Sequence, residues 1–224
     1  MQFEYHIKYS NRKTLNISVE RDRSIIVRAP EHLTVEKIDK LVQTKKQWIQ
    51  EKLNHTQKYP IIADSKEFVS GETLLFLGRN YQLSVVEEEI DGIEFDQRFK
   101  ISKTNQHKAN ELFKEWYLNQ AITKIKPLVI KYARSLGVEY NKIKISEMRY
   151  RWGSCTPKNN IIFNWRIIKA PMYVLEYLVA HELVHLIEGN HTFEFWNILS
   201  IQIPNYEKAK NWLKKNGQLL EIDF

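Results

Sequence analysis

The chain has 224 residues and a mass of 26.8 kDa, and 43% of its residues are hydrophobic. This length and composition provide enough apolar surface for a substantial core, which excludes a disordered chain. No run of about 18 apolar residues occurs, and the opening sequence MQFEYHIKYSNRK lacks the apolar segment of a signal peptide. We therefore expect a soluble, cytoplasmic protein with no membrane partner.

The formal net charge is +7, and basic residues concentrate in the middle of the chain. Residues 101–150 carry ten Lys and Arg against four Asp and Glu. Such a segment admits an acidic partner such as nucleic acid, although lysines on the outer face of a helix are also ordinary solvated groups. Cys155 is the single cysteine, which excludes an internal disulfide and a structural zinc site built on two or four cysteines.

The first part of the chain, residues 1–104, predicts an α+β domain rich in strands. The segments FEYHIKY, TLNISVE and SIIVRAP have partial alternation and indicate an antiparallel sheet. From Thr34, a plausible N-cap, apolar residues recur every three or four positions, which predicts a helix over about 34–53. The segment FVSGETLLFLGRNYQLSVVEE then predicts further strands joined by tight turns.

The second part, residues 105–224, is expected to be a separate catalytic domain. Apolar periodicity predicts a long helix over 108–136, which Pro127 should kink or divide. The segments KIKISEMRYRWGSC and IIFNWRII, joined by the turn TPKNN, predict a hairpin over 142–168. A helix then begins at Pro171 and is apolar nearly all round, so it belongs in a core and its charged residues need a separate explanation.

That apolar helix contains the sequence HELVH, an HExxH motif. His181 and His185 are about one turn apart, so both imidazoles project from one face and can reach the same tetrahedral metal ion. Glu182 lies beside them, where its carboxylate can reach a water on that ion. Because Zn²⁺ lowers the pKa of bound water towards about 7, this arrangement predicts metal-assisted amide hydrolysis with Glu182 as general base and one Zn²⁺ per chain.

A catalytic zinc usually needs a third protein ligand and a position left for water. His191 is our preferred third ligand, because it follows the expected end of the helix and the chain can turn back towards the ion. The carboxylates of Glu194 and Glu207, on later elements, are the alternatives. Glu188 lies on the same helix about 10 Å along the axis from His181 and is poorly placed to share the ion.

The spacing from His181 to His191 resembles the metzincin pattern HExxHxxGxxH, but two features exclude that group. Glu188 stands where the pattern has glycine. The only methionines are Met1, Met148 and Met172, so none follows the third histidine to form a Met-turn.

The sequence HELVHLIEGNHTFEFW, together with RYRWGSC and SGETLLFLGRNYQL upstream, resembles the YgjP-like family of zinc metallopeptidases, relatives of the SprT-like and WLM-type enzymes. The resemblance covers nearly the whole chain. It implies a zincin-like α+β catalytic domain behind a β-rich N-terminal portion, with zinc on His181, His185 and His191 and with Glu182 as catalytic base. The SprT-like relatives cleave proteins attached to DNA, and that link to nucleic acid is an analogy only.

The predicted hairpin lies just before the metal helix and is the natural sheet edge for pairing with an extended peptide substrate. Four residues on it are candidates for substrate binding: Arg151, Trp152, Gly153 and Ser154. Gly153 would allow close backbone approach, and Arg149 and Arg151 could hold a carboxylate or phosphate. A strand end with solvated arginines and a packed tryptophan explains these residues equally well. Tyr206 is a candidate donor to the tetrahedral oxyanion.

Two other functions remain open. One is a metal-dependent hydrolase of a non-peptide substrate. The other is a nucleic-acid-associated protein whose zinc site is structural or inactive, which should bind labelled DNA with a steep salt dependence and be indifferent to Glu182→Gln.

Overall fold

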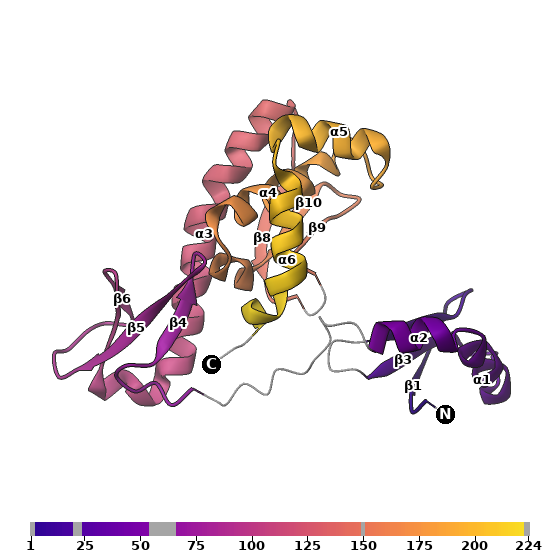
Figure 1. The fold of residues 1–224 in the computed structure, drawn as a ribbon, viewed down its shortest axis with the longest axis horizontal. Coiled ribbons are helices and arrows are strands. Elements are labelled where there is room, and N and C mark those ends of the chain that lie inside the picture. Colours follow the sequence, from indigo (N-terminus) through magenta and orange to yellow (C-terminus); the bar gives the residue numbers. More distant parts are fainter. Residues whose placement is uncertain (1–2, 20–23, 54–65, 149–150, 222–224) are drawn as a thin grey trace. The chain divides into compact units, whose positions relative to one another are not determined.

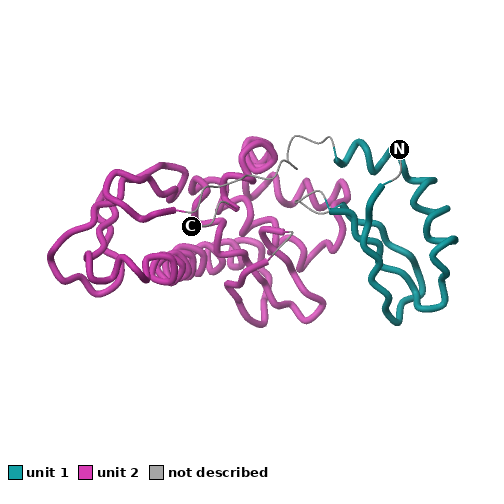
Figure 2. Tube along the Cα trace, turned by 90° about the horizontal axis from the view of Figure 1, so that it is seen from below, with its two compact units in different colours: residues 1–62 teal, residues 63–224 magenta. Residues whose placement is uncertain are grey.

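The computed structural model describes residues 3–19, 24–53, 66–148 and 151–221, and it is a mixed α+β structure, as expected. The chain divides into two compact units, Met1–Ile62 and Ala63–Phe224 (Figure 2). Each unit has its own hydrophobic core. Within the described part of the chain, no helix combines the length and the apolar character that crossing a membrane requires.

Unit 1 packs a three-stranded sheet against two short helices. Its elements are β1 (His6–Ser10), β2 (Asn16–Val19), β3 (Ile25–Pro30), α1 (Val35–Thr44) and α2 (Lys46–Leu53). The strand order is β1-β3-β2, and β1 runs parallel to β3 while β2 runs antiparallel to it. The expectation of a purely antiparallel sheet is therefore wrong. Local alternation identifies strands but does not specify which strands pair.

The helix expected over 34–53 is divided at Lys45, whose backbone leaves the helical region at φ −101° and ψ 11°. The Thr44 hydroxyl donates to the carbonyl of Leu41 at 2.7 Å, a local bond that competes with helix continuation. Thr34 is the N-cap residue, although its side chain makes no capping hydrogen bond. Both helices still bury apolar residues against the sheet, among them Ile38 and Ile49.

Unit 2 begins with a sheet that packs on the first half of a long helix. The sheet order is β4 (Thr73–Phe76), β5 (Arg79–Val86), β7 (Phe99–Ser102) and β6 (Glu94–Phe95). The helix is α3 (Ala109–Leu136), which η2 (Lys103–Lys108) precedes. Aromatic rings join the sheet to the helix, with ring centroids 4.9 Å apart for Phe76 and Trp116 and 5.4 Å apart for Phe99 and Phe113. The boundary expected at residues 104/105 therefore falls inside unit 2, because this aromatic core crosses it.

The helix α3 is continuous through Pro127, so of the two expected effects, a kink or a division, the division is wrong and the kink stays a prediction. Proline removes one helical hydrogen bond. Buried residues on both sides of it, including Ala121, Ile125 and Val129, offset that loss by packing against the core. Gly137 ends the helix in the left-handed conformation with φ 66°.

A second sheet in unit 2 contains β8 (Lys142–Ser146), β10 (Asn160–Asn164) and β9 (Gly153–Cys155), in that order. The expected hairpin is confirmed for β9 and β10, which are antiparallel, but β8 pairs in parallel on the other side of β10. Glu147 and Met148 follow β8 outside the sheet. Glu147 there forms an ion pair of 2.8 Å with the nearly buried Arg166, which needs a carboxylate partner.

The remaining elements are the helix that carries the HExxH motif and its neighbours along the chain. They are η3 (Trp165–Lys169), α4 (Met172–Val184), α5 (Phe193–Gln202) and α6 (Tyr206–Glu221). Figure 1 shows α4 inside unit 2, with α3, α6 and the β8–β10 sheet around it. Pro171 is its N-cap, in agreement with the sequence. Most residues of α4 are buried, which confirms that it is a core helix.

Candidate metal centre

The structure brings three histidines together at the C-terminal end of α4. His181 is in the last turn of the helix, His185 is its C-cap, and His191 lies in the turn before α5. Their ring centroids are 4.8–5.0 Å apart. One ligand nitrogen from each lies within 4.8 Å of the others, so the group could hold a metal ion. Glu194 and Glu207, the alternative third ligands, are not members of this group among the described residues.

Two hydrogen-bond contacts orient the imidazoles. His185 Nδ1 lies 3.1 Å from the carbonyl oxygen of Glu188. Because a carbonyl only accepts, that nitrogen carries the proton and Nε2 keeps its lone pair for a metal. The Nε2 atoms of His181 and His191 are 3.0 Å apart, close to the spacing of about 3.3 Å that two nitrogens have on a tetrahedral zinc.

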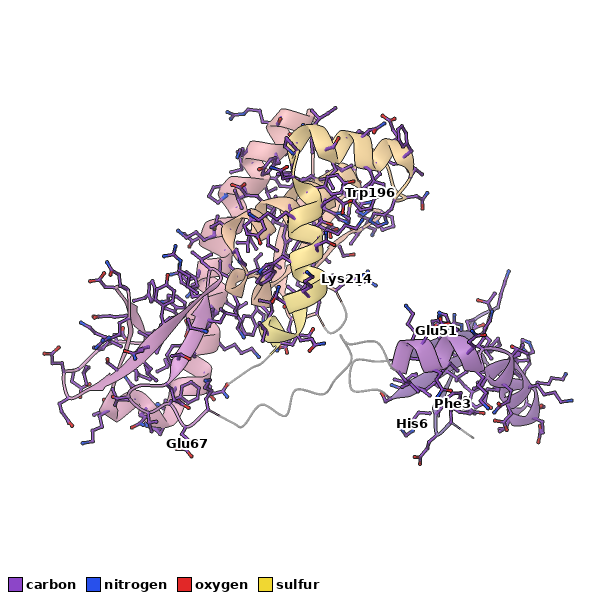
Figure 3. All side chains as sticks on the ribbon, viewed as in Figure 1. Phe3, His6, Glu51, Glu67, Trp196 and Lys214 are labelled. Atoms are coloured by element: carbon purple, nitrogen blue, oxygen red, sulfur yellow. The ribbon has the colours of Figure 1, made fainter. Side chains whose placement is uncertain are left out.

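An aromatic cluster packs around the three imidazoles. Phe195 is fully buried, and its ring centroid lies 4.6–4.9 Å from those of all three histidines. Trp196, labelled in Figure 3, stacks on His191 at 5.6 Å and on Tyr206 at 5.2 Å. This packing connects the turn that carries His191 to α5 and α6, and it limits the orientations that His191 can adopt.

Burial and neighbouring charge lower the pKa of His181 and of His191. Desolvation, helped by the other two histidines and by Lys210, lowers the pKa of His181 to about 3. Desolvation, with His185 and Lys210, also lowers the pKa of His191. A neutral imidazole is the form that binds a metal. No local pattern in the sequence marks the closeness of Lys210 to the histidines.

Glu182 lies next to these histidines and is 5% exposed. Desolvation raises its pKa to about 8, against the opposing effects of a hydrogen bond from the backbone N–H of Cys155 and the charge of Arg151. A carboxyl held in such an environment exchanges its proton near neutral pH, which suits a general acid or base. Burial, together with the Glu182 charge, raises the pKa of the Cys155 thiol, which argues against a nucleophilic cysteine.

A cavity of about 600 Å³ opens over this group. Arg151, Gly153 and Ser154 line it together with Glu182 and the histidines, whereas Trp152 and Tyr206 are not among its lining residues. The indole of Trp152 faces α6, since a Cβ added to Gly217 would lie 3.5 Å from its Cζ2 atom. Tyr206 stacks on Trp196, which in turn stacks on His191. Arg149, the other arginine considered, lies outside the described residues.

Comparisons with known proteins give the family. The family model of the YgjP-like metallopeptidase domain matches residues 13–216. The chain belongs to the YgjP-like metallopeptidases. The match covers both compact units of this YgjP-like protein and confirms the resemblance seen in its sequence. Membership of a metallopeptidase family implies a hydrolase with a metal ion and peptide substrates.

No curated protein matches this YgjP-like chain. Two solved structures are similar to it. One is the metallopeptidase zymogen jannalysin of Methanocaldococcus jannaschii, with 22% identity over 42% of this chain and 89% of that one and a TM-score of 0.38. The other is the zymogen abylysin of Pyrococcus abyssi, with 17% identity over 45% of this chain and 98% of that one and a TM-score of 0.39.

Proposed function

We propose that the protein is a zinc-dependent peptidase in which His181, His185 and His191 hold one Zn²⁺ and Glu182 is the general base. The observation that carries this proposal is the arrangement at the end of α4. Three ligand nitrogens lie within 4.8 Å of one another, and a buried carboxylate lies beside them in the same cavity. Metal ligands, a base and space for a substrate are the three requirements of metal-assisted hydrolysis.

The donor set supports zinc as the ion. Imidazole nitrogen is a preferred zinc ligand, and three protein ligands with a fourth position left for water are typical of catalytic sites. The lowered pKa values of His181 and His191 keep both rings in the ligating form at neutral pH. The backbone carbonyl of Glu188 supplies the outer partner that fixes the orientation of a ligating histidine, here His185.

A zinc ion in this site supplies Lewis-acid polarisation of the scissile carbonyl and lowers the pKa of water. The Glu182 carboxylate accepts a proton from the attacking water as the new C–O bond forms. It then donates that proton to the amine nitrogen as the C–N bond breaks, so that one water is consumed for each peptide bond cleaved. Burial of Glu182 excludes bulk water as a competing proton partner.

We place the substrate backbone along β9, which is an edge strand of its sheet. The hydrogen bonds from Thr156 to Asn160 and from Asn164 to Trp152 define the paired positions between β9 and β10. Antiparallel pairing alternates, so the backbone groups of Gly153 and Cys155 point away from β10. The Cys155 N–H already donates to Glu182, which leaves the groups of Gly153 and the Cys155 carbonyl for a peptide. An extended peptide can add to this edge, with Arg151 and Ser154 at the cavity wall to contact its side chains.

The test compares two Glu→Gln variants of the same helix. Glu182→Gln should retain about one Zn²⁺ per chain and lose cleavage of a mixed quenched-fluorescence peptide library by about 10³-fold, because it removes the general base. Glu176→Gln, which makes the same substitution outside the cavity lining, should cleave as the wild type does. Retained cleavage in zinc-loaded Glu182→Gln would remove Glu182 from the base role.

A further inference from the structure

The backbone of Gly153 lies against the side chain of Glu182. A Cβ atom built on Gly153 would lie 2.6 Å from Glu182 Cγ and 2.7 Å from Cδ, and closer still to Oε1. Non-bonded Cβ atoms are essentially never found closer than 3.0 Å to a heavy atom. Only glycine at this position leaves room for the carboxylate where it stands.

Little of the Glu182 side chain is exposed, and what is exposed lines the cavity. It is 5% exposed, and the backbone N–H of Cys155, two residues along β9, donates a hydrogen bond to it. The Glu182 side chain thus contacts β9 at two residues: it packs against the backbone of Gly153 and accepts a hydrogen bond from Cys155. A methyl group at Gly153 would force it away from both, because the polar atoms at the end of a side chain move more readily than a strand.

The strand itself is fixed from behind by Asn164. The backbone N–H of this buried residue donates to the Trp152 carbonyl at 2.8 Å, and its side-chain amide donates to the Met148 carbonyl at 2.8 Å and to the Arg151 carbonyl at 3.4 Å. The indole of Trp152 lies against Gly217 in α6. These contacts hold β9 in place, so crowding at Gly153 acts on Glu182.

We propose that Gly153 is a positioning residue for the general base: its lack of a side chain, with the Cys155 N–H beside it, fixes where the Glu182 carboxylate stands. This inference rests on the proposed role of Glu182. The sequence predicts a substrate-binding role for Gly153. The contact with Glu182 in α4 is an additional role, and the spacing of RWGSC does not reveal it.

Kinetics and metal content test the positioning role together. Gly153→Ala should retain about one Zn²⁺ per chain and an unchanged KM for one peptide taken from the cleaved library, while kcat falls by about 100-fold, the loss expected for a displacement near 1 Å. Glu182→Asp shortens the side chain by one methylene and makes room for the added methyl group. The Gly153→Ala/Glu182→Asp variant should therefore be at least as active as Glu182→Asp alone.

Thermal unfolding of the metal-free variants tests the contact without any activity. Gly153→Ala should lower Tm by roughly 3 °C when Glu182 is present and should not lower it in the Glu182→Ala background, where the crowded atoms are gone. Gly189→Ala is the matched control, because a Cβ there meets no atom within 4 Å. Its effect on Tm should be the same in both backgrounds.

The outcomes separate this inference from the proposed function. Full activity of zinc-loaded Glu182→Gln would overturn the base role, while coupled Tm values would still establish the contact. Inactive Glu182→Gln together with fully active Gly153→Ala and uncoupled Tm values would overturn the positioning role alone. A raised KM with unchanged kcat in Gly153→Ala would assign the glycine to substrate binding and overturn the positioning role as well.

Discussion

The helices α1 and α4 show two different relations between a helix and its core. In α1, Ile38 and Val42 are buried, Glu36, Lys37 and Lys40 are exposed, and the partly buried Asp39 accepts a hydrogen bond from Tyr5, so folding alone explains its pattern. In α4 most positions are buried, and one of the buried side chains is the carboxylate of Glu182. Burying an ionisable group opposes folding unless the group is neutralised or compensated. A buried carboxylate beside three histidines is therefore better explained by chemistry than by stability.

The largest effect that would sharpen this comparison is the pH dependence of stability. The pKa of Glu182 is about 8 in the folded protein and 4.5 for the unperturbed group, so the folded state holds the proton more tightly. Its stabilising contribution is present below pH 4.5 and is lost as the pH rises through 8. Metal-free Glu182→Gln should therefore gain on the order of 4 kcal/mol over metal-free wild type between pH 4 and pH 9.

Denaturant unfolding of both chelator-treated proteins across that pH range measures the difference. If the free energy of unfolding changed with pH in the same way for wild type and Glu182→Gln, burial of the carboxylate would cost no stability. The contrast between α4 and α1 would then fail.

The next largest effect concerns the packing of α1. Ile38 in α1 is fully buried in the small core of unit 1. Ile38→Ala should lower the free energy of unfolding of that unit by about 3 kcal/mol through lost packing and leave zinc binding unchanged. Hydrogen exchange localises the loss, and elemental analysis checks the metal. A loss of zinc in this variant would show that the site depends on unit 1.

The smallest effect concerns Lys210, which is close enough to lower the pKa of His181 and His191 and lies over the Trp196 ring at 4.1 Å. Its charge should also repel a metal cation, with strong solvent screening. Lys210→Met should tighten zinc binding about two-fold at low salt and less at high salt. A chelator competition titration measures this, and weaker binding in the variant would contradict the repulsion.

Much of α4 follows from its sequence, because its geometry is local. The four-residue spacing of His181 and His185 places both on one face of any helix, and the structure does bring them together with His191. The long helix α3 follows equally well from apolar periodicity. The roles of these histidines as zinc ligands remain predictions, since proximity is not binding.

Other features depend on contacts between distant segments, and local patterns do not encode them. The parallel pairing of β8 with β10 joins Lys142 to Asn160 and Ser146 to Asn164. The aromatic core that joins β4–β7 to α3 lies in one compact unit, so the division between the units falls at Ile62/Ala63, before the boundary at 104/105 that the pattern of strands and helices predicts. The contact between Gly153 and Glu182 joins residues that are 29 positions apart, and no pattern in the sequence around either residue predicts it.

The measurement that tests the central claim most directly is metal content per chain. Wild type and His191→Ala should be purified side by side without chelator and analysed for zinc. The three-histidine site predicts about one Zn²⁺ per wild-type chain and little in the variant, because two remaining protein ligands hold zinc weakly. Wild type without zinc after zinc is added back, or His191→Ala with the wild-type content, would contradict the account.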